Sequence, residues 1–495
     1  MVKNIDIARG FSMLCLDKQL SISQFNGIYD TVVPKDHFLR KLNETVDFSF
    51  ANRLMAKCYC LTNGRPAYEP EIMLKLLFLE MYYDLSDREM VKRAQTDMAI
   101  KMFLGLNPED KIPDDTLLVK FRTCRIDEGM LDEFLGETVR QAVQKGVVKS
   151  RSIIVDATHS KSKHSPKIPS QILRDMTKEL RKEIYKTQGE LHSFFPEKPE
   201  IEDDVFEQID YAKALCDALE NIEFESPKAE KQHRKIKEML NNPNLINLQN
   251  EHDEDAKTGH KSEDDTFFGF KNHIAVTEEG IVTAATVTNG TSPDGDQLPA
   301  LIEKSQQNGI DVDATIGDKA YSISKNLEYG EENGIEIISK LKKNVGAKEF
   351  QSEYVHFNKD ADTYECVCGF LAQCHKPQKK KNGSEQTEYS FSVSECGNCP
   401  HRSKCVTNKS DKYKRIWHRT SNPIFARQRE KEQTETFKQK LKIRWKIEQK
   451  NAHLKNNHGL GIQRGTGLSS MKTQCFLCLI VNNLAKIARV CDAMA

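Results

Sequence analysis

The chain has 495 residues, too many for one small hydrophobic core, so we expect two to four structural units. Hydrophobic residues make up 38% and charged residues 29%, which excludes a disordered or membrane-embedded chain and is typical of a globular protein. The longest strongly apolar stretch near the C-terminus, 475–481, is far shorter than the roughly 20 residues that span a bilayer. The first residues also lack the basic-then-apolar pattern of a signal segment. We therefore expect a cytoplasmic protein with no membrane partner.

The formal net charge is zero, but the charges are unevenly distributed. Residues 411–460 contain 14 Lys or Arg against 5 Asp or Glu, whereas residues 200–226 contain 10 acidic residues and one Lys. A basic segment of this kind could face a polyanion such as DNA while the acidic segment stays away from it. A solvated helix surface is the alternative interpretation.

The first 150 residues are expected to form a helical N-terminal domain. Residues 70–84 have the dense apolar pattern of a buried helix. Ser86 is followed three residues later by Glu89, a capping-box arrangement that begins another helix. Two helices separated at 84–86 could form a DNA-binding helix-turn-helix. An ordinary helical hairpin is equally compatible with the pattern.

An α/β pattern begins at Arg151. Residues 152–156 form a β-branched run that ends at Asp156, as expected of a buried strand. Residues 166–257 are polar and charged, with several prolines, and predict a helical insertion with mobile connections outside the core. Further strands are expected at 267–276, 281–287, 314–317 and 335–340, with a helix at 298–307. This order predicts a mixed α/β sheet core over residues 151–345.

The remaining sequence divides into two parts. Residues 346–422 are rich in Cys, Gly and Lys and predict a second insertion. Residues 423–495 predict a long charged helix at 423–457 and an apolar helix at 471–490, which would complete the core.

Three acidic residues are the strongest candidates for a site. Asp156 ends a predicted strand, Asp318 lies at the polar exit of another in Ile-Gly-Asp-Lys-Ala-Tyr321, and Glu448 lies within the charged helix. Carboxylates at strand ends can project into one crevice at a sheet edge. Phosphodiester chemistry needs such hard oxygen ligands, which hold two Mg²⁺ ions about 4 Å apart. Each acid alone could instead be a structural cap.

The sequence around Glu448 adds two cations. Arg444 lies four residues before Glu448 and Lys455 seven after it. At about 100° per residue, all three share one helix face over roughly 16 Å. The metal-binding candidate is thus flanked by groups suited to phosphates.

These motifs resemble the DDE transposases of the insertion-sequence group marked by a Tyr-x2-Arg-x3-Glu-x6-Lys signature. Arg444, Glu448 and Lys455 match three of its four positions, and Leu441 stands where the family has tyrosine. The other similar segments are Ile-Ile-Val-Asp156-Ala-Thr, Asp318-Lys-Ala-Tyr321, the hairpin segments 253–257 and 268–273, and the N-terminal segments 83–89, 103–106 and 113–114. The resemblance covers nearly the whole chain, with its motifs in the family's order.

The resemblance implies a ribonuclease H-like core and a Mg²⁺ or Mn²⁺ requirement. The implied reaction is hydrolysis at the ends of an insertion sequence, followed by attack of the freed 3′-hydroxyl on target DNA. It also implies binding to terminal inverted repeats and to target DNA, a homodimer on paired ends, and a bacterial cytoplasm near the nucleoid. The implied metal ligands are Asp156, Asp318 and Glu448, and the implied DNA contacts are Arg444, Lys455, Lys319 and Lys271.

The cysteines suggest a second metal. Fourteen cysteines in a cytosolic chain favour thiols or metal ligands over disulfides, and six lie between Cys366 and Cys405. Cys396, Cys399 and Cys405 are the best candidates for a structural zinc site, because a tetrahedral site takes thiolates from short turns. The fourth ligand would come from Cys366, Cys368 or Cys374, with Cys368 taken here. Reduced free thiols fit the pattern equally well, because the spacing is not that of a standard finger.

Other functions remain open at this point. A catalytically inactive or regulatory DNA-binding relative, a metal-dependent nuclease without strand transfer, and a zinc-binding scaffold all fit parts of the sequence. Pro293-Asp294-Gly-Asp296 is interpreted as a turn, not as a metal site.

Overall fold

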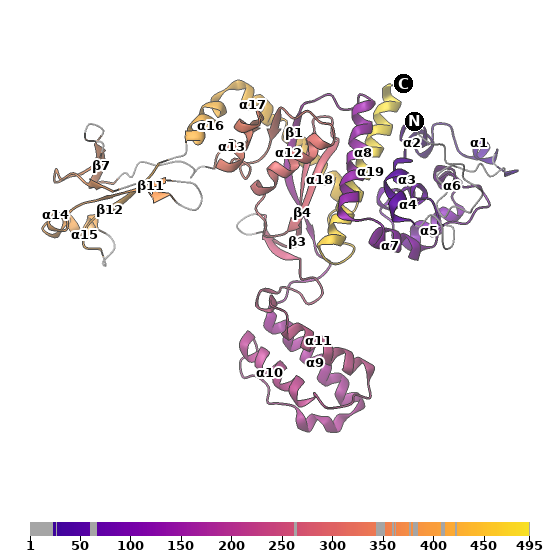
Figure 1. Cartoon of the computed structure of the whole chain (residues 1–495), viewed down its shortest axis with the longest axis horizontal. Helices are drawn as coiled ribbons and strands as arrows, with labels where there is room; N and C mark the ends of the chain where they lie inside the picture. The colour runs from indigo at the N-terminus through magenta and orange to yellow at the C-terminus, as the bar shows by residue number, and fades with distance from the viewer. Residues whose placement is uncertain are drawn as a thin grey trace, which may run out of the picture.

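A central sheet, seen in a computed structural model, carries helices on both sides (Figure 1). A three-helix unit extends from one end of the sheet, and a small Cys-rich module lies beyond α16 (Pro423–Gln433). The structure describes residues 23–25, 27–59, 67–261, 265–342, 352–358, 361, 363–375, 378–379, 385–406, 411–420 and 423–494.

The described residues before Arg151 form helices, as predicted. Asp84, in the left-handed conformation with φ 52°, ends one helix. The predicted capping box then begins the next, since Ser86 Oγ accepts the Glu89 N–H and the Glu89 carboxylate accepts the Ser86 N–H. The helices are α1 (Ile28–Val32), α2 (Phe38–Thr45), α3 (Phe50–Met55), α4 (Pro70–Tyr83), α5 (Asp87–Thr96), α6 (Met98–Leu104), α7 (Asp115–Cys124) and α8 (Glu128–Gln144), with a 3₁₀ turn at Ala56–Cys58.

The sheet has a mixed topology. Its strands are β1 (Ser152–Lys161), β2 (Lys257–His260), β3 (Thr266–Thr277), β4 (Val282–Asn289), β5 (Ala314–Ile316) and β6 (Glu336–Ile338). β3 pairs antiparallel with β1 and also with both β2 and β4. β5 runs parallel to β1, and β6 runs parallel to β5. An antiparallel β4-β3-β1 meander continued by two parallel strands confirms the predicted ribonuclease H-like core.

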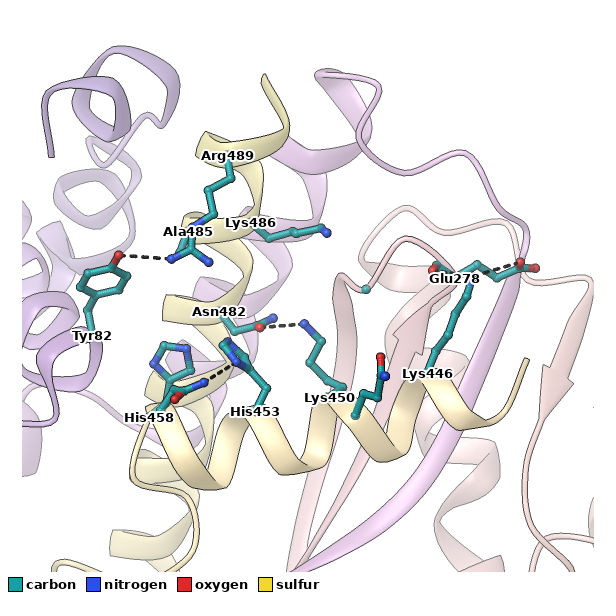
Figure 2. A pocket seen from close by; sticks show the side chains of 13 residues that line it. Tyr82, Glu278, Lys446, Lys450, His453, His458, Asn482, Ala485, Lys486 and Arg489 are labelled. Atoms are coloured by element: carbon teal, nitrogen blue, oxygen red, sulfur yellow. Dashed lines mark hydrogen bonds and ion pairs between the residues drawn. The ribbon is translucent and has the colours of Figure 1, made fainter. Parts of the chain in front are cut away.

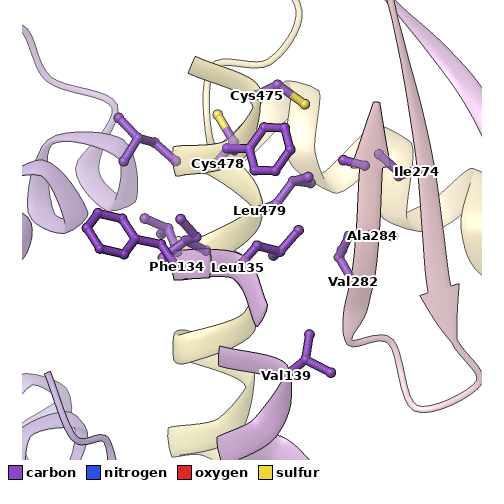
Figure 3. Close-up of a cluster of buried hydrophobic side chains, with 14 of the residues drawn as sticks. Phe134, Leu135, Val139, Ile274, Val282, Ala284, Cys475, Cys478 and Leu479 are labelled. Atoms are coloured by element: carbon purple, nitrogen blue, oxygen red, sulfur yellow. The ribbon is translucent and has the colours of Figure 1, made fainter. Parts of the chain in front are cut away.

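Successive residues of β4 bury side chains on opposite faces of the sheet. Val282 and Ala284 lie in a buried cluster with residues of α8 and of α19 (Leu468–Met494), as Figure 3 shows. Thr283 Oγ1 lies 2.7 Å from Ser305 Oγ of α12 (Leu298–Gln307). Because side chains alternate along a strand, α12 and α19 cover opposite faces.

The N-terminal helices and the sheet share one hydrophobic core. A single cluster of buried side chains contains Leu77 of α4, Phe134 of α8, Ile274 of β3 and Leu479 of α19. α19 is long and apolar enough to cross a membrane by length and composition, but 78% of its most apolar window is buried inside the protein. This helix is therefore the structural link between the N-terminal helices and the sheet.

The helical insertion has a core of its own. α9 (Pro169–Thr187), α10 (Val205–Ala218) and α11 (Pro227–Leu240) pack around Leu180, Leu215 and Ile236, all fully buried. Short 3₁₀ turns lie at Gly189–Phe194 and Leu245–Asn247. The prediction of helices outside the main core is confirmed, and they form a compact unit.

The Cys-rich region forms small sheets and short helices. β7 (Val355–Asn358) pairs with β8 (Thr363–Cys366), and β11 (Glu385–Ser390) pairs with β9 (Gln373–Cys374), β10 (Gln378–Lys379) and β12 (Arg415–Thr420). α14 (Val393–Gly397) and α15 (Arg402–Cys405) lie between β11 and β12.

The predicted long helix at 423–457 is wrong, because the segment folds as three helices. α16 ends at Gln433, α17 spans Glu435–Lys442, and α18 spans Trp445–Asn457. Thr434 Oγ1 accepts the N–H of Phe437 at 3.3 Å, which caps α17 and begins a new helix direction. A further helix, α13 (Ser324–Glu332), precedes β6.

Candidate active site

Asp156 and Asp318 lie on neighbouring strands. Asp156 is in the middle of β1 and not at its end as predicted, because β3 pairs with β1 from Ile153 to Lys161. Asp318 follows β5 by two residues, and β5 runs parallel to β1. The Asp318 carboxylate is oriented by its own turn, since its Oδ1 accepts the Ala320 N–H at 2.8 Å.

The two aspartates interact electrostatically. Burial, and after it the charge of the neighbouring Asp318 carboxylate, raise the pKa of Asp156 to about 7, while the Arg444 guanidinium opposes the shift. Asp294 adds a smaller repulsion. Two repelling carboxylates in a partly buried position are a favourable environment for a cation.

One face of α18 meets β1 at this position. Asn451 Nδ2 donates a hydrogen bond to Asp156 Oδ2 at 3.0 Å. Glu448 lies one turn earlier on the same helix face, half-exposed, and forms an ion pair with Arg444. Because Arg444 also acts on Asp156, its guanidinium lies near both acids. No group of three or more His, Cys, Asp or Glu side chains in the described ranges is already arranged to hold a metal ion.

The four predicted DNA contacts have different surroundings. Lys455 is half-buried, and its pKa is lowered by burial and by the nearby Lys261, so two cations gather beside the acids. Lys319 is exposed next to Asp318. Lys271, in contrast, lies 2.9 Å from Asp294 and also donates to the Ser292 carbonyl, so its charge already has a partner within the protein.

Sequence reasoning did not select three residues at this position: Asn451, Tyr321 and Asp294. Tyr321 is 1% exposed, and its Oη has no hydrogen-bond partner within the described structure. Burial and the charges of Asp156, Asp294 and Asp318 raise its pKa well above the ordinary value, so the hydroxyl stays protonated. Asp294 lies in the predicted turn but contributes charge to the site. The signals in the sequence were the i+3 spacing of Asn451 from Glu448 and the place of Tyr321 in the Asp318-Lys-Ala-Tyr321 motif.

The opposite face of α18 lines a basic cleft of about 580 Å³ (Figure 2). Lys446 and Lys450 from α18 lie there with Lys486 and Arg489 from α19. Burial, together with the smaller effect of the Lys486 and Arg489 charges, lowers the pKa of Lys450 to about 8. Glu278 is the one acidic residue among the described residues that line the cleft. Glu278 pairs with Lys446 at 3.9 Å, so the described residues that line the cleft keep an excess of positive charge.

A ribonuclease H-like sheet that presents two aspartates to a helix carrying Arg, Glu and Lys defines a nucleic-acid-processing enzyme. Comparison with known families makes the assignment more specific. Residues 148–484 match the family described as "Transposase DDE domain", and residues 28–124 match "Transposase domain (DUF772)". The first match covers more than half of the chain, so this chain belongs to the DDE transposase family. The four-residue signature itself stays an expectation, because Leu441 occupies its tyrosine position.

Proposed function

We propose that this transposase cleaves the ends of an insertion sequence and joins the 3′-hydroxyl ends to target DNA. The observation that carries the proposal is the pair of aspartates on parallel neighbouring strands, met by the Arg444–Glu448–Asn451–Lys455 face of α18. This arrangement combines oxygen ligands with cations suited to phosphates.

Asp156, Asp318 and Glu448 would hold Mg²⁺ or Mn²⁺. The residues fit such ions, because all three are carboxylates and because the repulsion between Asp156 and Asp318 would be relieved by a divalent cation. When bound, two such ions activate the nucleophile and stabilise the leaving oxygen. Glu448 would exchange its ion pair with Arg444 for the metal, which frees the guanidinium for a DNA phosphate.

The chain's other residues would position these groups. Asn451 holds the Asp156 carboxylate through the 3.0 Å hydrogen bond and limits its rotation. The protonated Tyr321 hydroxyl can donate to an oxygen atom beside the acids. Arg444, Lys455 and Lys319 would contact phosphates near the cleaved bond, whereas Lys271 would act mainly through Asp294.

The basic cleft supports a second contact with DNA on the other side of α18. A phosphodiester backbone offers the compensating charge that Lys450, Lys486 and Arg489 lack among the described residues. The N-terminal helices beside it would bind the terminal inverted repeats, and two chains would assemble on the paired ends.

The test uses supercoiled plasmid, a labelled pre-cut end and Mg²⁺. We expect the wild-type protein to join the end to the plasmid and Asp156→Asn to bind both DNAs without joining them. Glu448→Gln is tested in the same assay. Its control is Glu430→Gln, which changes an exposed acid on α16. Cleavage without joining would replace the proposal by a nuclease, and binding without reaction by a regulatory protein.

A further inference from the structure

Five cysteines of the Cys-rich module lie in or beside one small pocket. Cys366 ends β8 and Cys368 follows in the turn, Cys396 lies in α14, Cys399 follows that helix, and Cys405 ends α15. Cys366, Cys396, Cys399 and Cys405 line the same pocket, and Cys368 Sγ lies against Cys399 Sγ. Residues far apart in sequence thus bring soft ligands near one another, well away from the acids described above (Figure 1). No three of the described side chains are already arranged around a metal position, so the sulfurs would have to move closer together to bind one.

The sulfur spacing suits a metal and not a disulfide. The Cys368 and Cys399 sulfurs are 3.8 Å apart, and all five cysteines are free. A disulfide would need about 2.05 Å. Two thiolates on one tetrahedral zinc, with Zn–S bonds of about 2.3 Å, lie about 3.8 Å from each other.

The surroundings favour bound thiolates. The backbone N–H of Lys414 donates to Cys396 Sγ at 3.5 Å, and Lys414 Nζ donates to the Cys405 carbonyl at 2.8 Å. Hydrogen bonds to the ligand sulfur and a nearby cation stabilise the negative charge of a zinc–thiolate group.

The part of the module that the structure describes has a small apolar interior. Its buried cluster comprises Val355, Tyr364, Ala372, Tyr389, Phe391 and Ile416. Small units with few buried side chains usually depend on a disulfide or a metal for stability. The described cysteines form no disulfide, so a metal is the remaining cross-link.

We propose that this module holds one structural zinc ion through Cys396, Cys399, Cys405 and a thiolate from the Cys366–Cys368 turn. The ion would draw four sulfurs into one shell and connect β8, α14 and α15. We do not assign Cys374 as a ligand, because its exposed side chain does not line this pocket and its Sγ donates to the adjacent His375 carbonyl. The proposal does not depend on the transposition reaction.

The test measures metal content in the full-length protein. We expect about one zinc per chain in the wild type and in the control Cys374→Ser. Cys396→Ser, Cys399→Ser, Cys405→Ser and the double variant C366S/C368S should lose it. A zinc-free wild type whose near-ultraviolet circular dichroism is unchanged by a strong chelator would overturn the proposal, as would equal zinc loss in Cys374→Ser.

Cobalt exchange keeps the test decisive if the serine variants fail to fold. Wild-type protein exchanged with Co²⁺ should show the intense visible d–d bands and the thiolate charge-transfer band of a tetrahedral tetrathiolate site. Weak octahedral bands without thiolate charge transfer would refute the site. Trypsin cleavage within the module should increase only after the metal is removed.

Discussion

Replacing Asn451 by alanine removes the one hydrogen bond that α18 donates to Asp156 in the described structure. The bond joins an amide to a carboxylate at 3.0 Å, and Asn451 is 8% exposed, so water compensates little. Hydrogen bonds to charged groups contribute about 1.5–3 kcal/mol. If the hydrogen bond contributes this free energy to holding Asp156 in place in the transition state, its loss raises the activation barrier by the same amount. Asn451→Ala should then slow strand transfer by about 10- to 150-fold.

The assay follows the joining of a labelled pre-cut end to plasmid at increasing Mg²⁺. We expect Asn451→Ala to need more Mg²⁺ for half-maximal rate, because a less ordered Asp156 binds the ion more weakly, and to bind DNA as the wild type does. Asn456→Ala is the matched control, since Asn456 is an exposed amide on the same helix that does not line the opposite cleft. A rate within about twofold of wild type at every Mg²⁺ concentration, or a loss of stability with unchanged Mg²⁺ dependence, would refute the positioning role.

Three other outcomes follow from the structure. Asn483→Leu should lower the free energy of unfolding by about 3–5 kcal/mol in guanidinium titrations, because Asn483 bonds both the N–H and the carbonyl of Val282 in a fully buried position. Burial lowers the pKa of His458 to about 4, which outweighs its hydrogen bond to the Met81 carbonyl. The folded state therefore prefers the neutral imidazole, and the stability that this preference contributes is present above about pH 6.5 and lost as pH falls toward 4. Thermal unfolding of His458→Gln should show a smaller loss of stability between neutral pH and pH 5 than thermal unfolding of the wild type. Lys450→Ala should weaken binding to all DNA sequences alike and reduce the slope of log affinity against log salt by about 1, and an unchanged slope would remove the cleft from the DNA path.

Local signals in the sequence predicted much of the fold correctly. The capping box at Ser86 and the hairpin of β3 and β4 are encoded within a few residues, and α12 has the predicted bounds. The two strand-associated aspartates were found for the same reason, because an apolar run followed by a carboxylate is visible in one window.

Features that depend on distant contacts could not be predicted. Asn451 is a site residue only because α18 meets β1, 295 residues earlier in the chain. The helix break near Thr434 could not be predicted from the sequence, because the charged residues on both sides are good helix formers. The helical pattern therefore continues across the capping residue. The common core of the N-terminal helices and the sheet likewise depends on α19, whose partners its own sequence does not identify.

The central claim is that Asp156, Asp318 and Glu448 together bind divalent metal. Calorimetric titration of Mn²⁺ into Asp156→Asn, Asp318→Asn and Glu448→Gln tests it most directly, with Glu430→Gln as the control. We expect wild type and control to bind Mn²⁺ alike and each of the three variants to bind at least about tenfold more weakly. Wild-type Mn²⁺ affinity in both aspartate variants would contradict the account.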